Sequence, residues 1–126
     1  MWEIEFYESA NGDCPAREFL VSLNKKDELP YVKRAIDHLQ EFGNQLRRPQ
    51  ADYLEYGIFE LRISVKRKQI RLLYFYFYQD KIVISHGLRK EAKVKTSDIE
   101  KAKSIRAIIF HDAKENDEIH RFHSRN

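Results

Sequence analysis

Near its start the chain changes from a strand pattern to a helical one. Residues 2–6 (WEIEF) alternate apolar and acidic side chains, which is typical of a strand with one apolar face. Residues 11–13 (NGD) then interrupt the strand. A helix is predicted to follow, with Asp13 or Cys14 as its cap and Pro15 in its first turn, where proline costs no hydrogen bond.

A second helix is predicted over residues 29–42. Its apolar residues recur at helical spacing, and Gly43 is placed to end it, since glycine readily adopts the conformation that stops a helix. Residues 44–56 show no clear period and are interpreted as a connecting loop. The helical apolar positions are Leu29, Val32, Ile36 and Leu39.

Three strand-like runs and a final helix make up the next part. The runs are residues 57–65 (GIFELRISV), 69–78 (QIRLLYFYFY) and 81–90 (KIVISHGLRK). Ser97 and Glu100 have the spacing of a capping box that opens a helix. The apolar side of this helix is expected to hold Ile99, Ala102, Ile105 or Arg106, and Ile109.

The predicted order is β-α-α-β-β-β-α, an α+β domain whose helices pack on one face of an antiparallel sheet. A chain of 126 residues is long enough for one modest core. We therefore expect a single domain over residues 1–110. Residues 111–126 form a polar C-terminal tail, either a short helical extension or disordered.

The pairing register decides where three arginines lie. A hairpin turning about Lys66 and Arg67 gives a coherent apolar face and places Arg62 opposite Arg71, where like charges repel. A second hairpin turning about Asp80 places Arg71 opposite Arg89, although a one-residue slip would scatter the arginines between the two faces. The apolar pairs expected are Leu61 with Leu72, Phe59 with Tyr74, Ile63 with Ile70, Leu72 with Leu88 and Tyr76 with Ile84.

A row of three arginines across a sheet favours a phosphate site, because guanidinium groups bind phosphate through forked donors. The charge distribution supports this prediction. Residues 62–106 carry 13 Lys and Arg against 4 Asp and Glu, whereas residues 1–61 carry 7 against 12. The basic segment holds the strands and is expected to attract a polyanion. The alternative is that these charges only solvate the sheet.

Other features limit the class of protein. The single cysteine, Cys14, excludes a disulfide framework. No signal peptide and no membrane-spanning apolar run is recognised, so a cytoplasmic location is expected. No metal or cofactor is expected, because the acidic residues of the basic half are scattered and the histidines at 111, 120 and 123 lack partner ligands.

The segments GIFELRI, IRLLYFYF and KIVISHGLRKEAKVKTSDIEKA resemble the C-terminal half of RelE/ParE-superfamily toxins, nearest to the HigB-like, phage-associated branch. The resemblance follows the element order over residues 2–109 and the sequence over residues 57–103. It implies a RelE/ParE-like fold and a type II toxin that cleaves mRNA on the ribosome. It also implies a cognate antitoxin of the helix-turn-helix type as partner, and no membrane.

By position, the resemblance implies that Arg71 stabilises charge on the scissile phosphate and that Arg89 lies near the leaving group. The alternative for Arg71 is a structural salt bridge to Glu60. His86 is a further catalytic candidate because its free pKa is near neutrality, but in the predicted register it faces the core beside Tyr74. The full set of candidates is Arg71, Arg89, Lys90 and His86 for catalysis, and Arg62, Lys66, Arg67, Lys68, Lys93 and Lys95 for RNA binding.

The segment KVKTSDIE lacks the tyrosine that some RelE-type enzymes place beside the final helix. Either another group transfers the proton, or activity is reduced or lost. Three functions therefore stay open. The first is a ribosome-dependent mRNA endoribonuclease that uses 2′-OH attack without metal. The second is a ParE-like gyrase inhibitor. The third is a non-catalytic module that binds RNA or an antitoxin.

Overall fold

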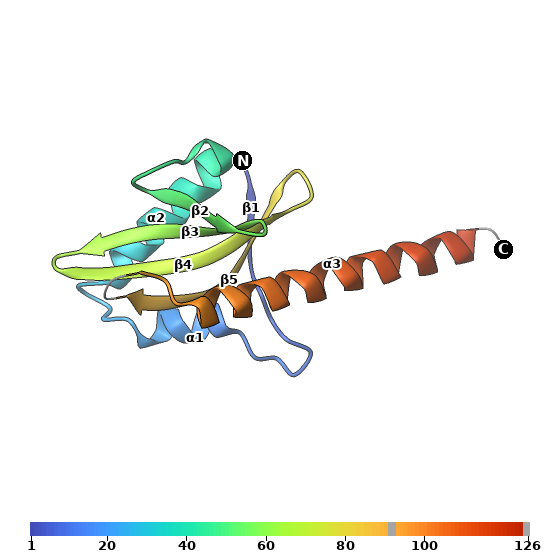
Figure 1. Ribbon diagram of the computed structural model, residues 1–126, viewed down its shortest axis with the longest axis horizontal. Coiled ribbons are helices and arrows are strands. Elements are labelled where there is room, and N and C mark those ends of the chain that lie inside the picture. Colours follow the sequence, from blue (N-terminus) through green and yellow to red (C-terminus); the bar gives the residue numbers. More distant parts are fainter. Residues whose placement is uncertain (91–92, 125–126) are drawn as a thin grey trace.

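The computed structural model describes residues 1–90 and 93–124, with side chains as far as residue 117. One sheet with the strand order β1-β5-β4-β3-β2 runs through the molecule (Figure 1). Its strands are β1 (Glu3–Phe6), β2 (Ala51–Glu55), β3 (Ile58–Val65), β4 (Lys68–Phe77) and β5 (Lys81–Lys90). The helices are α1 (Pro15–Ser22), α2 (Leu29–Phe42) and α3 (Thr96–Ser124), with a 3₁₀ turn at Gly43–Gln45.

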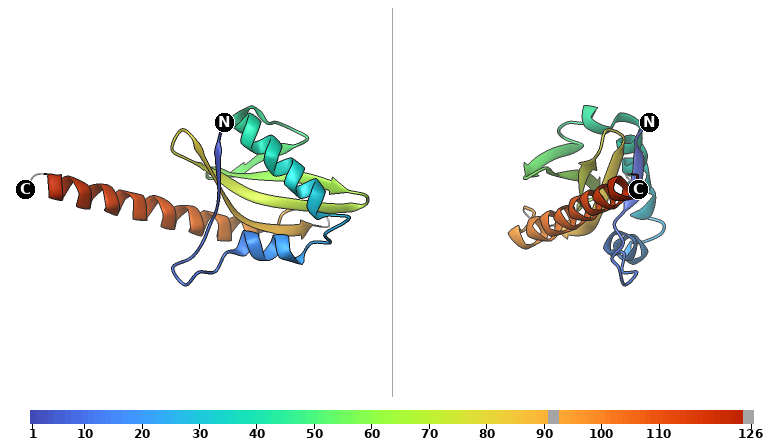
Figure 2. Two further views of the ribbon diagram at one scale, coloured as in Figure 1. Left: turned by 180° about the vertical axis from the view of Figure 1, so that it is seen from behind. Right: turned by 90° about the vertical axis from the view of Figure 1, so that its right-hand side faces the viewer.

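The α+β class is confirmed, with three corrections to the predicted architecture. The segment 44–56 is not only a loop, because it contains the edge strand β2, which pairs with β3. The sheet is mixed and not purely antiparallel, since β1 runs parallel to β5. The helices cover both faces of the sheet and not one (Figure 2).

Each face of the sheet has its own core. On the α1/α2 face, Val32 and Leu39 of α2 pack over Leu61, Leu72 and other residues of the central strands. On the α3 face, Ala102 and Ile105 of α3 pack over Phe75. Because both faces are covered, β4 is buried along most of its length. A polar side chain on β4 therefore lies in a largely dry environment and needs a partner.

The first hairpin has the predicted register. Arg62 lies opposite Arg71, and the apolar pairs Phe59–Tyr74, Leu61–Leu72 and Ile63–Ile70 form as expected. Lys66, in the two-residue turn, has a φ of 57°, a conformation that a tight hairpin turn requires.

The predicted register of the second hairpin is wrong. Tyr76 pairs with Ile82, two residues from the expected partner, which leaves the side chains of β5 before Ser85 on their predicted faces. A bulge at Ser85 then inserts one residue, so that Arg71 pairs with Leu88 and Arg89 pairs with Ile70. Since side chains alternate between faces, the extra residue turns the side chains after Ser85 to the face opposite to the predicted one.

The last helix is longer than predicted and leaves the body of the protein. α3 begins at Thr96, so Ser97 already lies inside the helix and Glu100 lies beyond its first turn, and the two do not form the expected capping box. It continues to Ser124 and projects beyond the sheet, so the tail is helical that far (Figure 1). Among the helices that the structure describes, none has the length and apolar composition needed to cross a membrane.

Candidate functional site

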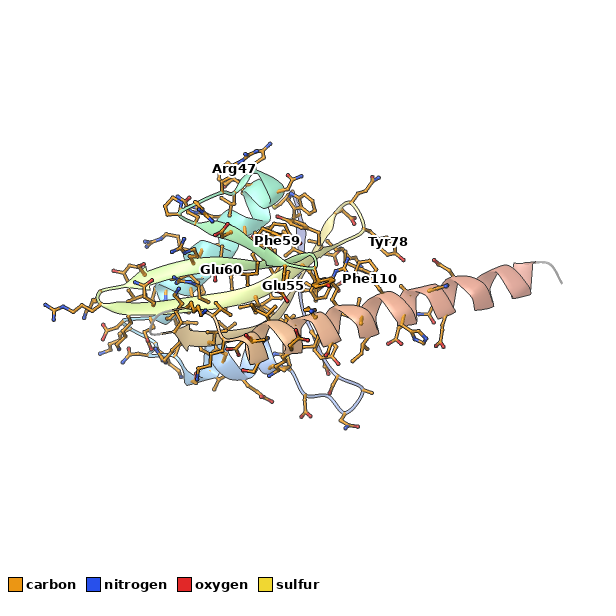
Figure 3. The ribbon with its side chains drawn as sticks, in the orientation of Figure 1. Arg47, Glu55, Phe59, Glu60, Tyr78 and Phe110 are labelled. Carbon is orange, nitrogen blue, oxygen red and sulfur yellow. The ribbon has the colours of Figure 1, made fainter. Side chains whose placement is uncertain are left out.

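Two opposed arginines and one carboxylate lie together on the α3 face of the sheet. We call this group the Arg62–Arg71 centre. Arg62 of β3 and Arg71 of β4 are directly paired. Glu60, two residues before Arg62, lies on the same face, in the middle of the sheet (Figure 3). Its carboxylate oxygens are 3.7 Å from the Nε atom of each arginine. One carboxylate therefore faces two guanidinium groups, which leaves a positive charge in surplus.

Arg71 is the more deeply placed of the two arginines. It is 1% exposed, and its Nη1 donates to the Ile70 carbonyl at 2.9 Å and to Gln69 Oε1 at 3.2 Å. Its Nε has no hydrogen-bond partner among the described residues. Burial lowers the pKa of Arg71, and the Arg62 charge lowers it further, against the effect of Glu60. A buried donor without a hydrogen bond is unfavourable, and the nearest acceptor is the Glu60 carboxylate at 3.7 Å.

Lys90 completes this site from the neighbouring strand. It pairs with Gln69 in the β4–β5 ladder and so shares the α3 face with Arg71. Burial lowers the pKa of Lys90, and the charges of Arg71 and Arg62 lower it further. A lysine with a lowered pKa releases its proton more readily than a free lysine does.

Arg89 does not join these residues, so the predicted row of three arginines is wrong. It pairs with Ile70 and therefore points to the α1/α2 face. There it holds the carboxylate of Glu28, the residue just before α2, through two hydrogen bonds, one of them 2.7 Å from Nη2 to Oε1. The hydrogen bond from Arg89, together with that from the Asn24 amide, lowers the pKa of Glu28 to about 2.

His86 also changes face because of the bulge. It is buried opposite Leu73 on the α3 face, and not beside Tyr74 on the α1/α2 face as predicted. Its Nδ1 is 2.6 Å from the Ser85 hydroxyl and its Nε2 is 3.4 Å from Asp98 of α3. Burial lowers the pKa of His86, and the Lys101 charge adds to this, against the effect of Asp98. Both ring nitrogens have partners, so His86 fastens β5 to α3.

A comparison with protein families assigns the chain. The model of the family Phage derived protein Gp49-like (DUF891) matches residues 18–109. The chain belongs to this family. The matched residues begin in α1 and end in α3, so they include Glu60, Arg62, Arg71 and Lys90. Among curated proteins, none matches this Gp49-like chain.

The remaining basic candidates of the Gp49-like protein gather at the same end of the sheet. Lys66 and Arg67 form the β3–β4 turn, and Lys68 begins β4, all three exposed. Lys93 and Lys95 are exposed in the segment that leads from β5 to α3. Figure 1 shows the β3–β4 turn and the end of β5 at one end of the sheet. The structure therefore gathers these cations at the end of the sheet that holds the β3–β4 turn.

The other sequence candidates lie elsewhere in the Gp49-like protein. Cys14 is a buried free thiol. In the part of α3 with described side chains, His111 lies with Asp112 and Glu115 in an exposed group whose ligand atoms are within 4.8 Å of one another. The side chains of His120 and His123 lie outside the described residues. That the protein needs no metal stays a prediction.

Of the three carboxylates that contact candidate site residues in the described part of the chain, only Glu60 was predicted from the sequence, as the salt-bridge alternative for Arg71, and the structure places the two side chains 3.7 Å apart. Asp98 and Glu28 were missed. Asp98 offered a weak signal, as an acidic residue in the first turn of α3. Glu28 gave none, because its partner Arg89 is 61 positions away in the chain.

Proposed function

We propose that this Gp49-like protein is the toxin of a type II toxin–antitoxin module and that it cleaves mRNA without a metal ion. Membership of a phage-derived family and the basic end of the sheet support the proposal. The observation that carries it is the Arg62–Arg71 pair, because its surplus positive charge and the part-exposed Arg62 side chain fit a bound phosphate.

In the proposed reaction the 2′-hydroxyl of the RNA attacks the adjacent phosphorus. The 2′-O–P bond forms, the P–O5′ bond breaks, and the products are a 2′,3′-cyclic phosphate and a 5′-hydroxyl. Arg62 and Arg71 stabilise the charge that develops on the phosphorane oxygens. Lys90 takes part in proton transfer, since it shares the site and its pKa is lowered. The ribosome is expected to align the mRNA for in-line attack.

His86 and Arg89, two of the catalytic candidates, have other roles in this proposal. His86 positions the start of α3 beside the site through Asp98. Arg89 lies on the opposite face of the sheet and does not reach the phosphate held by Arg71. The leaving oxygen therefore receives its proton from Lys90 or from water.

An antitoxin partner is part of the same proposal. Exposed cations at one end of the sheet bind nucleic acid non-specifically unless they are covered. We expect a cognate antitoxin of the helix-turn-helix type to cover them. The acidic or amphipathic segment of such a protein would complement the basic residues of 62–106.

The burial of Arg71 favours a second candidate, a non-catalytic module that binds RNA or an antitoxin. An arginine that is 1% exposed and paired with Glu60 can serve packing alone. Activity separates the two candidates. A catalytic toxin requires the RNA to displace Glu60 from the arginines, whereas a binding module leaves this ion pair intact.

Inducible expression followed by primer extension of cellular transcripts tests the proposal. We expect growth arrest and new transcript ends within coding regions. Isolated RNA with added EDTA, without ribosomes and at high enzyme concentration, should still yield 2′,3′-cyclic or 3′-phosphate ends. Products with 3′-hydroxyl ends, or cleavage that requires Mg²⁺, would contradict the mechanism. A DNA-damage response without transcript cleavage would indicate a gyrase inhibitor instead.

A further inference from the structure

A cationic pocket lies at the ends of β4 and β5, beside the Arg62–Arg71 centre. It has a volume of about 550 Å³ and is open to solvent. Four of its five lining residues are cations and none is acidic. The lining residues are Arg67, Lys68, Gln69, Arg89 and Lys90.

A buried carboxylate orients two of these cations. Glu28 is 1% exposed, and its oxygens accept both hydrogen bonds from Arg89. Lys68 Nζ lies 3.8 Å from Glu28 Oε2. The Asn24 amide donates to Glu28 Oε1 at 2.8 Å, which fixes the carboxylate to the loop before α2. The two cations of the pocket wall are therefore held by a carboxylate that is itself buried.

The anchored cations keep free donors. The Arg89 side chain is 45% exposed and that of Lys68 is 58% exposed. Glu28 occupies two of the donors of Arg89, and a guanidinium has five. A single carboxylate cannot neutralise both cations, so the pocket keeps a positive charge. If the Glu28–Arg89 ion pair served stability alone, it would need neither the second cation, Lys68, nor an exposed arginine side chain.

The pocket adjoins the proposed cleavage site. Gln69 and Lys90 belong to both, and Gln69 Oε1 accepts a hydrogen bond from Arg71. Lys68 and Arg89 lie on the opposite face of the sheet, in the terminal residues of β4 and β5. A polyanion bound at Arg62 and Lys90 on the α3 face that continues around the ends of β4 and β5 therefore meets the pocket next.

We propose that Arg67, Lys68 and Arg89, the last two anchored by Glu28, form a second phosphate subsite. It binds the phosphodiester of the RNA nucleotide next to the scissile one. This inference rests on the proposed function for the identity of the polyanion. Single-stranded RNA fits because its backbone presents regularly repeated phosphates, and an arginine fork binds each of them in a defined orientation.

The test is binding of a fully 2′-O-methylated oligonucleotide, which keeps the phosphates but lacks the attacking hydroxyl. The affinity of the purified full-length protein is measured from low to high salt. The Arg67→Ala/Lys68→Ala variant should bind about tenfold more weakly, the loss of about one charge-assisted hydrogen bond. The slope of log K against log salt should become shallower by about 0.7, the value for one single-strand phosphate contact.

Two further variants separate the subsite from structural effects. Arg89→Lys keeps the charge but loses the fork, and should weaken binding while the melting temperature reports any loss of the Glu28 contact. Lys33→Ala/Arg34→Ala removes the same charge from the exposed side of α2 and should leave the slope unchanged. A polyglutamate peptide serves as the polyanion that is not a nucleic acid.

Three results would overturn the inference. These are no saturable binding by the wild-type protein, an unchanged slope in the Arg67→Ala/Lys68→Ala variant, and equal affinity for polyglutamate. If the proposed cleavage function is wrong but the phosphate subsite exists, the experiments give a different pattern. In that case transcripts stay uncleaved in cells, while the oligonucleotide still binds through the pocket.

Discussion

Arg62 and Arg71 lie directly opposite each other on neighbouring antiparallel strands, and the Glu60 carboxylate lies 3.7 Å from the Nε atom of each. Opposed like charges destabilise a sheet, and one carboxylate compensates only one of them. The two arginines differ in their surroundings, because the side chain of Arg62 is 35% exposed and that of Arg71 is 2% exposed. Substitutions at the two positions should therefore have different consequences.

Replacing Arg62 should affect activity and not stability. Arg62→Ala removes a part-exposed ion pair, which contributes at most about 1 kcal/mol, and also relieves its repulsion with Arg71. We expect loss of growth inhibition with a melting temperature close to that of the wild type. Lys33→Ala, an exposed cation of α2, is the matched control and should remain toxic. Full toxicity of Arg62→Ala would argue against a phosphate contact at this position.

Replacing Arg71 should affect stability as well. Arg71→Ala leaves the buried Glu60 carboxylate without its buried partner, which costs about 3–5 kcal/mol. Urea denaturation measures this loss. The double variant Glu60→Gln/Arg71→Met removes both charges and should recover most of the stability without recovering activity. A loss below about 1 kcal/mol in Arg71→Ala would show that the pair is not buried in solution.

Lys90 should determine the pH dependence of cleavage. Its pKa is lowered by burial and by Arg71, so the neutral amine becomes available below the usual pKa of lysine. If the neutral amine is the base, the single-turnover rate should rise with pH and level off below that value. Lys90→Arg keeps the charge but cannot release its proton, and should lower the rate by about 10²–10⁴ and remove the rise. An unchanged pH profile in this variant would exclude Lys90 as the base.

Glu28 should make the free energy of unfolding depend on pH in the acid range. Its folded pKa is about 2 and its ordinary value is 4.5, so its contribution is present above pH 4.5 and is lost as the pH falls towards 2. Glu28→Gln should reduce the free energy of unfolding at pH 7 by about 1.5–3 kcal/mol, the range for hydrogen bonds to charged groups. Urea denaturation across this pH range should show the difference from wild type shrinking in acid.

Glu41→Gln, an exposed carboxylate of α2, is the control and should leave stability at pH 7 unchanged. A constant difference between Glu28→Gln and the wild type down to pH 2 would contradict the depressed pKa.

Local patterns in the sequence determined the elements and the first hairpin. The apolar spacing of residues 29–42 predicted α2 at its observed bounds, since a helix that packs on a sheet needs one continuous apolar stripe. The β3–β4 register follows because any one-residue slip would turn Leu61 and Leu72 away from the core. The edge strand β2 was missed because its residues are mostly part-exposed and lack that alternation.

Only the tertiary structure decided which basic residues share a face. The alternation of side chains is visible in the sequence of β5, but the bulge at Ser85 is not. The bulge moves His86, Leu88 and Arg89 to the opposite face. The partners of the inverted residues come from distant parts of the chain, Glu28 for Arg89 and Asp98 for His86. Burial and charge pairing are properties of the folded molecule, because they depend on side chains that no local spacing brings together. The sequence therefore determined that this end of the sheet is basic. The fold decided that Arg62, Arg71 and Lys90 form one site there, and that Arg89 belongs to another.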